Sequence, residues 1–211
     1  VELNGETLNT NQMFAQFSER FKKDVATKIR AGIVNGLETI DIAVEVKKMV
    51  TNRTFNQAQA IILTVANAVG DNARHEVFKN NQNLFNGEEY VATLDSRTTI
   101  RCASLDGKIF AFNEGPRPPQ HYRCRSVGVP IIKPEYDLIP DKERASKDGA
   151  IPAKTTYSEW LKKQPHAVQD EVLGFERAKL FREGKFTLEQ FVDYTGRTYT
   201  LNELKIADKI L

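Results

Sequence analysis

The sequence predicts an α+β protein that is mainly helical, with a small β-hairpin subdomain in the middle of the chain and a helical C-terminal unit. Apolar residues recur at three- and four-residue steps before residue 87 and after residue 155, which is the period of an amphipathic helix. Between these regions lie β-rich runs and turn residues, and all eight prolines lie at or beyond Pro116. We therefore expect helices at 1–86, a hairpin and proline loop at 87–133, a linker or ordered arm at 134–154, and small helices at 155–211.

The first region is predicted to form three helices. The first carries an apolar stripe that ends before Gly32 and Gly36: Phe14, Phe17, Phe21, Val25 and Ile29. Thr39 is the expected N-cap of a second helix that runs through Met49. The third carries an apolar face that we expect to pack against another helix: Phe55, Ala58, Ile62, Val65, Val69, Ala73 and Val77, widened by Ile61, Ala66 and Phe78. On this helix His75 is expected to be solvated or hydrogen-bonded rather than a metal ligand.

The second region has the pattern of a hairpin followed by a stiff loop. Tyr90–Leu94 is rich in strand-forming residues, and Asp106–Gly107 with the following Lys108–Phe110 predicts a turn and a return strand. Gly115–Pro119 contains three prolines, so it can be neither a helix nor a central strand. This loop leads directly to His121.

Beyond residue 155 the chain is predicted to form several short helices. Apolar spacing places them around Tyr157–Leu161, Val168–Leu173 and Ala178–Phe181, and a proline or glycine follows each one. Thr187–Gln190 has the composition of a further helix start.

Length and composition exclude several classes of protein. With 211 residues, 40% of them hydrophobic and 27% charged, the chain can bury a core and is not expected to be disordered. The longest apolar stretches are a few residues long, which argues against a membrane-spanning helix. Two cysteines are too few for a disulfide scaffold, and no signal peptide is visible. Because the chain begins with Val1 rather than methionine, we expect it to be a trimmed or processed part of a longer protein.

Net charge alone does not indicate a partner. The chain has 30 Lys and Arg against 28 Asp and Glu, which leaves a formal charge of +2. Residues 101–133 nevertheless carry six basic and two acidic side chains, a local excess of +4. Such a run is typical of a solvated loop surface, and it is also compatible with an acidic partner or nucleic acid.

One group of residues has the types and spacing that suit a bound metal ion. Cys102, His121 and Cys124 lie within 23 residues, and the His-x-x-Cys spacing lets two side chains reach one ion from a single turn. A hairpin would bring the third ligand, the sulfur of Cys102, to the same place. Thiolate and imidazole suit zinc, which takes four ligands in a tetrahedron. Asp95, Asp106, water or a partner chain are the candidates for the fourth ligand.

Three interpretations of this group remain open. The first is a structural zinc site. The second is a pair of buried cysteines, either free or joined as a Cys102–Cys124 disulfide, with His121 hydrogen-bonded. The third is catalysis by zinc-bound water or a Cys–His nucleophile pair, flanked by Asp95, Arg97 and Arg125. A P-loop, a G-x-S-x-G elbow, an H-E-x-x-H pair and the zinc-deaminase pattern are all absent from the sequence. We therefore expect that the protein is not an enzyme.

Three short motifs follow one another within about 31 residues. They are D-x-R-T at 95–98, C-x-x-L-D-G-K at 102–108 and P-P-x-H-x-x-C-R at 118–125. In this order they resemble the head-morphogenesis domain of tailed bacteriophages, the family of the phage Mu F protein and the minor head protein of phage SPP1. The segments at 157–165, 169–174 and 177–181 resemble an extension found in some members, so the resemblance covers most of residues 30–205.

The resemblance implies a minor structural protein of the phage head, associated with the portal vertex. It implies action in procapsid assembly and DNA packaging, or passage with the DNA at ejection, by binding rather than catalysis. Expected partners are the portal protein, other head proteins and packaged double-stranded DNA. The expected location is the virion, after assembly in the host bacterial cytoplasm. Members of the family place a cysteine where this chain has Thr99, so the implied four-ligand set is one short here.

Four arginines are the expected contacts with a protein partner or with DNA: Arg97, Arg117, Arg123 and Arg125. The segment at 101–126 places arginines beside aromatic residues, which suits either kind of partner. Two alternatives stand beside the assembly role. One is an enzyme with a Cys/His site, such as a toxin-like nuclease or transferase, and the other is a sequence-independent DNA-binding module.

Overall fold

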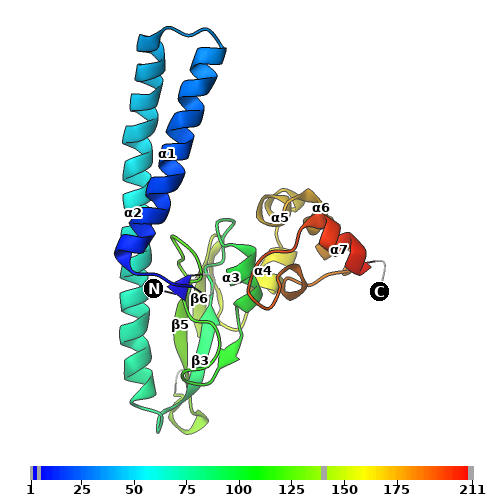
Figure 1. Cartoon of the computed structure of the whole chain (residues 1–211). Coiled ribbons are helices and arrows are strands. Elements are labelled where there is room, and N and C mark those ends of the chain that lie inside the picture. The colour runs from blue at the N-terminus through cyan, green and yellow to red at the C-terminus, as the bar shows by residue number, and fades with distance from the viewer. Residues whose placement is uncertain (1, 4–5, 139–141, 209–211) are drawn as a thin grey trace.

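The computed structural model describes residues 2–3, 6–138 and 142–208. It is mainly helical with small antiparallel sheets, which confirms the predicted α+β class. A long two-helix hairpin stands along one side of a compact body, and the C-terminal helices lie on the body's other side (Figure 1). Within the described residues, none of the helices combines the length and hydrophobicity of a membrane span.

The hairpin consists of α1 (Thr10–Val34) and α2 (Thr39–Lys79). Asn9 caps α1, and the chain reverses near Gly36, whose φ of 69° lies in the left-handed region that glycine adopts readily. We expected two helices between residues 39 and 79, but α2 is a single helix of 41 residues that begins at Thr39, with Glu38 as its N-cap. No glycine or proline falls between Met49 and Phe55 to interrupt it.

The face of α2 that packs on the body is not the predicted one. Ile62 and Val69 are each 63% exposed, and Ala73 and Val77 are exposed as well. The buried side chains of this half of the helix are Ala60, Ile61, Thr64, Ala68, Asp71 and His75. Ile61, at the edge of the predicted face, is buried as expected. The prediction was wrong for the four exposed residues because Thr64, Asp71 and His75 are polar residues on the packed face, where hydrogen bonds satisfy them. The side chains of Phe14, Phe17, Phe55 and Ala58 lie outside the described part of the structure.

The central sheet has the strand order β4-β3-β5 and is antiparallel throughout. Its strands are β3 (Phe85–Val91), β4 (Ile109–Phe110) and β5 (Val127–Ile132). The predicted return strand therefore pairs with its partner, but the two are not joined by a tight turn. A short helix, α3 (Ile100–Leu105), stands between them, and Cys102 lies on this helix.

Gly87 allows β3 and β4 to approach closely. A methyl group at this position would lie 2.5 Å from the carbonyl oxygen of Phe110, and the φ of Gly87 is 139°. Any larger residue would push β4 away from the sheet.

The region at 134–154 forms a hairpin that is bonded to the body. After one 3₁₀ turn, η1 (Pro134–Tyr136), the strands β6 (Glu143–Ser146) and β7 (Gly149–Pro152) pair antiparallel. The N–H of Lys147 donates to the carbonyl of Leu94 at 2.9 Å, next to an isolated bridge. We call residues 142–154 the arm.

The C-terminal unit contains α4 (Tyr157–Lys162), α5 (His166–Leu173), α6 (Phe175–Arg182) and α7 (Leu201–Asp208). The first three lie where the sequence predicts them. The expected start at Thr187–Gln190 is a single 3₁₀ turn, η2 (Glu189–Phe191). One hydrophobic core joins these helices to the central region through Leu94 and Ala103.

At the other end of the chain, β1 (Glu2–Leu3) pairs with β2 (Glu6–Thr7).

Candidate metal centre

The structure brings Cys102, His121 and Cys124 together. One possible ligand atom from each residue lies within 4.8 Å of the other two. Cys102 is in the first turn of α3, where the hydroxyl of Thr99 accepts its backbone N–H and caps the helix. The irregular loop after β4 carries His121 and Cys124 back over this helix end. Both thiols are free rather than joined by a disulfide.

The distances suit a tetrahedral zinc ion. The two sulfurs are 3.7 Å apart, and two thiolates on one zinc at about 2.3 Å each are separated by about 3.8 Å. Nδ1 of His121 lies 2.8 Å from the carbonyl oxygen of Tyr122. A proton on Nδ1 donates to this carbonyl and leaves Nε2 free for a metal. Two thiols and an imidazole are also the donor types that zinc prefers.

The pKa directions show which groups are charged when no ion is bound. The hydrogen bond from Cys102, together with His121, lowers the pKa of Cys124 well below that of a free thiol. The same pairing with Cys124, followed by burial, raises the pKa of Cys102. Burial opposes a charge on His121, but the hydrogen bond and charge of Cys124 outweigh it and raise the pKa of the ring. These directions favour a negative charge on Cys124 over Cys102 and a positive charge on the neighbouring His121 ring.

The surroundings of the cysteines are closed and mostly apolar. Cys102 is 1% exposed and Cys124 is 3% exposed, and both belong to a buried cluster with Tyr90, Ala92 and Leu105. The hydroxyl of Tyr90 donates to the sulfur of Cys102 at 3.1 Å. His121 is the most accessible of the three ligands. A closed site of this kind resembles structural zinc sites more than catalytic ones, which keep an open position for substrate.

The two carboxylates proposed as a fourth ligand have other partners. Among the described residues, the group of ligand atoms contains neither of them. Asp95 receives two hydrogen bonds of 2.6 Å from the guanidinium of Arg125, and this contact holds the pKa of Asp95 below its usual value. Asp106 accepts the N–H groups of Ala92 and Tyr157 at 2.6 Å each and pairs with Arg144.

The four arginines expected to bind a partner differ in their surroundings. Arg125 is held by Asp95, and Arg117 is held by Asp71 at 3.0 Å. Arg123 is exposed and donates only to neutral groups, the carbonyl of Asn56 and the side chain of Gln59. The side chain of Arg97 is 76% exposed and 3.5 Å from Asp95. Two of the four are therefore largely neutralised within the protein.

A buried polar network near the proline loop was not predicted. Nδ1 of His75 lies 2.6 Å from a carboxylate oxygen of Glu88, and Arg117 bonds Asp71 on the same face of α2. His75 is therefore hydrogen-bonded, which was one of the two environments expected for it. Thr64, Asp71 and His75 at seven- and four-residue steps were the available signal, because this spacing places three polar residues on a single face of the helix.

Comparison with known proteins identifies a similarity that covers half of the chain. A family model described as phage Mu protein F like protein matches residues 23–129. The match includes the whole of α2, β3, α3 and the three candidate ligands. No curated protein and no solved structure matches the chain.

Proposed function

Because the chain belongs to the phage Mu protein F-like family, we propose that it is a minor structural protein of a tailed-phage head that acts by binding at the portal vertex. The observation that carries the proposal is the family match over the segment that contains all three motifs. The role is assembly of the head or packaging of DNA, and the partners are the portal protein and other head proteins.

We also propose that one structural zinc ion is bound by Cys102, His121 and Cys124. The loop between β4 and β5 has little regular structure of its own, so a metal that joins it to α3 would stabilise it. When bound, the ion supplies cross-linking rather than chemistry on a substrate. The protein's own residues hold the loop in place, through Arg117 on Asp71 and Arg125 on Asp95. This geometry supports binding in preference to catalysis.

Purified portal protein provides the direct test of the proposed partner. We expect the chain to form a complex with the portal protein that sediments as one species in analytical ultracentrifugation. Replacing the two exposed arginines, in the double variant Arg97→Ala and Arg123→Ala, is expected to weaken the complex. Arg30→Ala, an exposed position far along α1, is the matched control. Separate sedimentation of the two proteins at every concentration would contradict the proposed partner.

Binding of double-stranded DNA is expected to be weak. Arg117 and Arg125 are held closely by carboxylates, which leaves the exposed Arg97, 3.5 Å from Asp95, and Arg123, bonded to the neutral side chain of Gln59, so few phosphates can be contacted. The double variant of these two residues is expected to lower the slope of log Kd against log salt by about 2. Fluorescence anisotropy with a short duplex, over a range of salt concentrations, measures this slope. An equal loss for Arg30→Ala would mean that the contact is not at these arginines.

A further inference from the structure

The strand β4 forms an open edge of the central sheet. The order β4-β3-β5 leaves one side of β4 without a neighbouring strand. The N–H of Tyr90 donates to the carbonyl of Lys108, and Glu88 pairs with Phe110 in the same register. Since bonded and non-bonded pairs alternate in an antiparallel ladder, the N–H and C=O of Ile109 point away from β3. Among the described residues nothing bonds these two groups, and the Ile109 side chain is 60% exposed.

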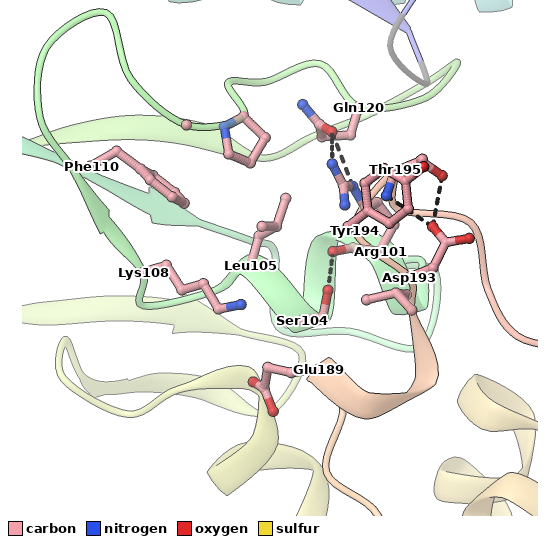
Figure 2. A pocket seen from close by; sticks show the side chains of 13 residues that line it. Arg101, Ser104, Leu105, Lys108, Phe110, Gln120, Glu189, Asp193, Tyr194 and Thr195 are labelled. Atoms are coloured by element: carbon pink, nitrogen blue, oxygen red, sulfur yellow. Dashed lines mark hydrogen bonds between the residues drawn. The ribbon is translucent and has the colours of Figure 1, made fainter. Parts of the chain in front are cut away.

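Cavities lie on both faces of this edge. One, of about 810 Å³, is lined by Lys108 and Phe110 together with α3, the proline loop and the turn at 189–195. Figure 2 shows Lys108, which directly precedes β4, and Phe110 in β4 pointing into it on the side of Leu105. The other, of about 680 Å³, is lined by Ile109, Glu89 and residues of the arm. Alternate side chains of β4 therefore line different cavities.

The charges of the first cavity favour an acidic group beside β4. Lys108 is exposed, and no carboxylate among the described residues lies within ion-pair distance of it. Arg101 bonds only the neutral oxygen of Gln120, at 3.0 and 3.1 Å. On the opposite wall, Asp193 is bonded to Arg197 and Thr195, while Glu189 is exposed. Lys108 is thus the cationic group on the β4 side of the cavity, whereas Arg101 lies beside the turn that carries Tyr194 and Thr195 (Figure 2).

We propose that β4 is a docking edge for an extended segment of a partner protein, which adds to the sheet as a fourth strand. The exposed groups of Ile109 supply main-chain hydrogen bonds, and the two cavities receive alternate side chains of the partner. On the Lys108 face the partner carries an acidic residue and, two positions away, an apolar residue next to Phe110. On the Ile109 face it carries an apolar residue. A lysine at a sheet edge discourages pairing with unrelated strands. Here Lys108 would also select a partner that carries the acidic residue.

An end-blocked fluorescent peptide, Ser-Val-Leu-Val-Asp-Val-Ser, has this pattern for antiparallel addition. We expect it to bind the full chain, with slower amide exchange at Ile109 in its presence. An isomer with Leu and Asp adjacent, so that one of them faces Ile109, is expected to bind at least about tenfold more weakly. Equal affinity for the two peptides, no binding of either, or unchanged exchange at Ile109 would overturn the proposal.

Two variants locate the site independently. Ile109→Pro removes the outward N–H while leaving the bonds to β3, and it is expected to weaken binding at least about tenfold relative to Ile109→Val. Lys108 is exposed, so Lys108→Glu is expected to fold normally. This variant is expected to reverse the preference toward a peptide with Lys in place of Asp. Unchanged binding in both variants would overturn the proposal. The inference rests on the proposed assembly role only for the identity of the partner, so failure of the peptide test leaves the virion tests below unaffected.

Discussion

Cys102→Ser is expected to release one bound zinc ion and to lower the melting temperature by about 10 °C or more. Loss of a structural metal is one of the few single changes that remove 4 kcal/mol or more, roughly, from the stability of a domain. Here the ion would join α3 to a loop with little regular structure, so both would loosen together. Elemental analysis of protein purified without chelator, with calorimetry of the same samples, measures both effects.

Two further variants make this test specific. Tyr90→Phe removes the hydrogen bond to the Cys102 sulfur without removing a ligand, so we expect it to retain zinc. Thr99→Cys supplies the thiol that the family pattern implies, and Thr99 lines the same cavity as His121. It is expected to tighten zinc binding in competition with a chelator. Wild-type protein without metal, and cysteine variants that melt at the same temperature as wild type, would contradict the zinc site.

Asp106→Ala is expected to destabilise the protein by about 3–5 kcal/mol. The Asp106 side chain is fully buried and joins three parts of the chain: the end of β3 through Ala92, the arm through Arg144, and the start of α4 through Tyr157. Its removal leaves the Arg144 guanidinium buried without a carboxylate and orphans two backbone N–H groups. Urea unfolding followed by circular dichroism measures the free-energy change.

An exposed ion pair serves as the matched control for Asp106. Glu45 and Lys28 are paired at 3.3 Å, but both side chains are nearly half exposed. Glu45→Gln is therefore expected to change the free energy of unfolding by no more than about 1 kcal/mol. Arg144→Met combined with Asp106→Ala should be less destabilising than the sum of the single variants, since the uncompensated charge is gone. A loss below about 1 kcal/mol for Asp106→Ala would contradict the role assigned to this carboxylate.

The parts of the fold that follow local rules were predictable from the sequence. The C-terminal helices have clear boundaries, such as the Thr156 and Glu159 capping box at α4 and Gly174, with φ of 76°, after α5. The candidate ligands were also found from spacing alone, because Cys102 and Cys124 are close along the chain.

The remaining features depend on contacts between distant segments. The ion pair between Asp106 and Arg144 spans 38 residues, and no local pattern indicates that a buried arginine lies in the arm. The packed face of α2 was wrongly predicted because Asp71 and Thr64 are polar yet buried there. Asp95 and Asp106 are prominent in the sequence motifs, but in the structure they bind guanidinium groups and backbone N–H groups and do not join the three candidate ligands.

Mass spectrometry of purified phage particles tests the central claim most directly. We expect the chain to be present at low copy number relative to the major head protein, and to cross-link to the portal protein when a photoreactive residue replaces Arg123. The same substitution at Arg30 is expected to give no portal adduct. Absence of the chain from purified particles, together with no adduct to the portal protein from either position in assembling heads, would contradict the proposed role.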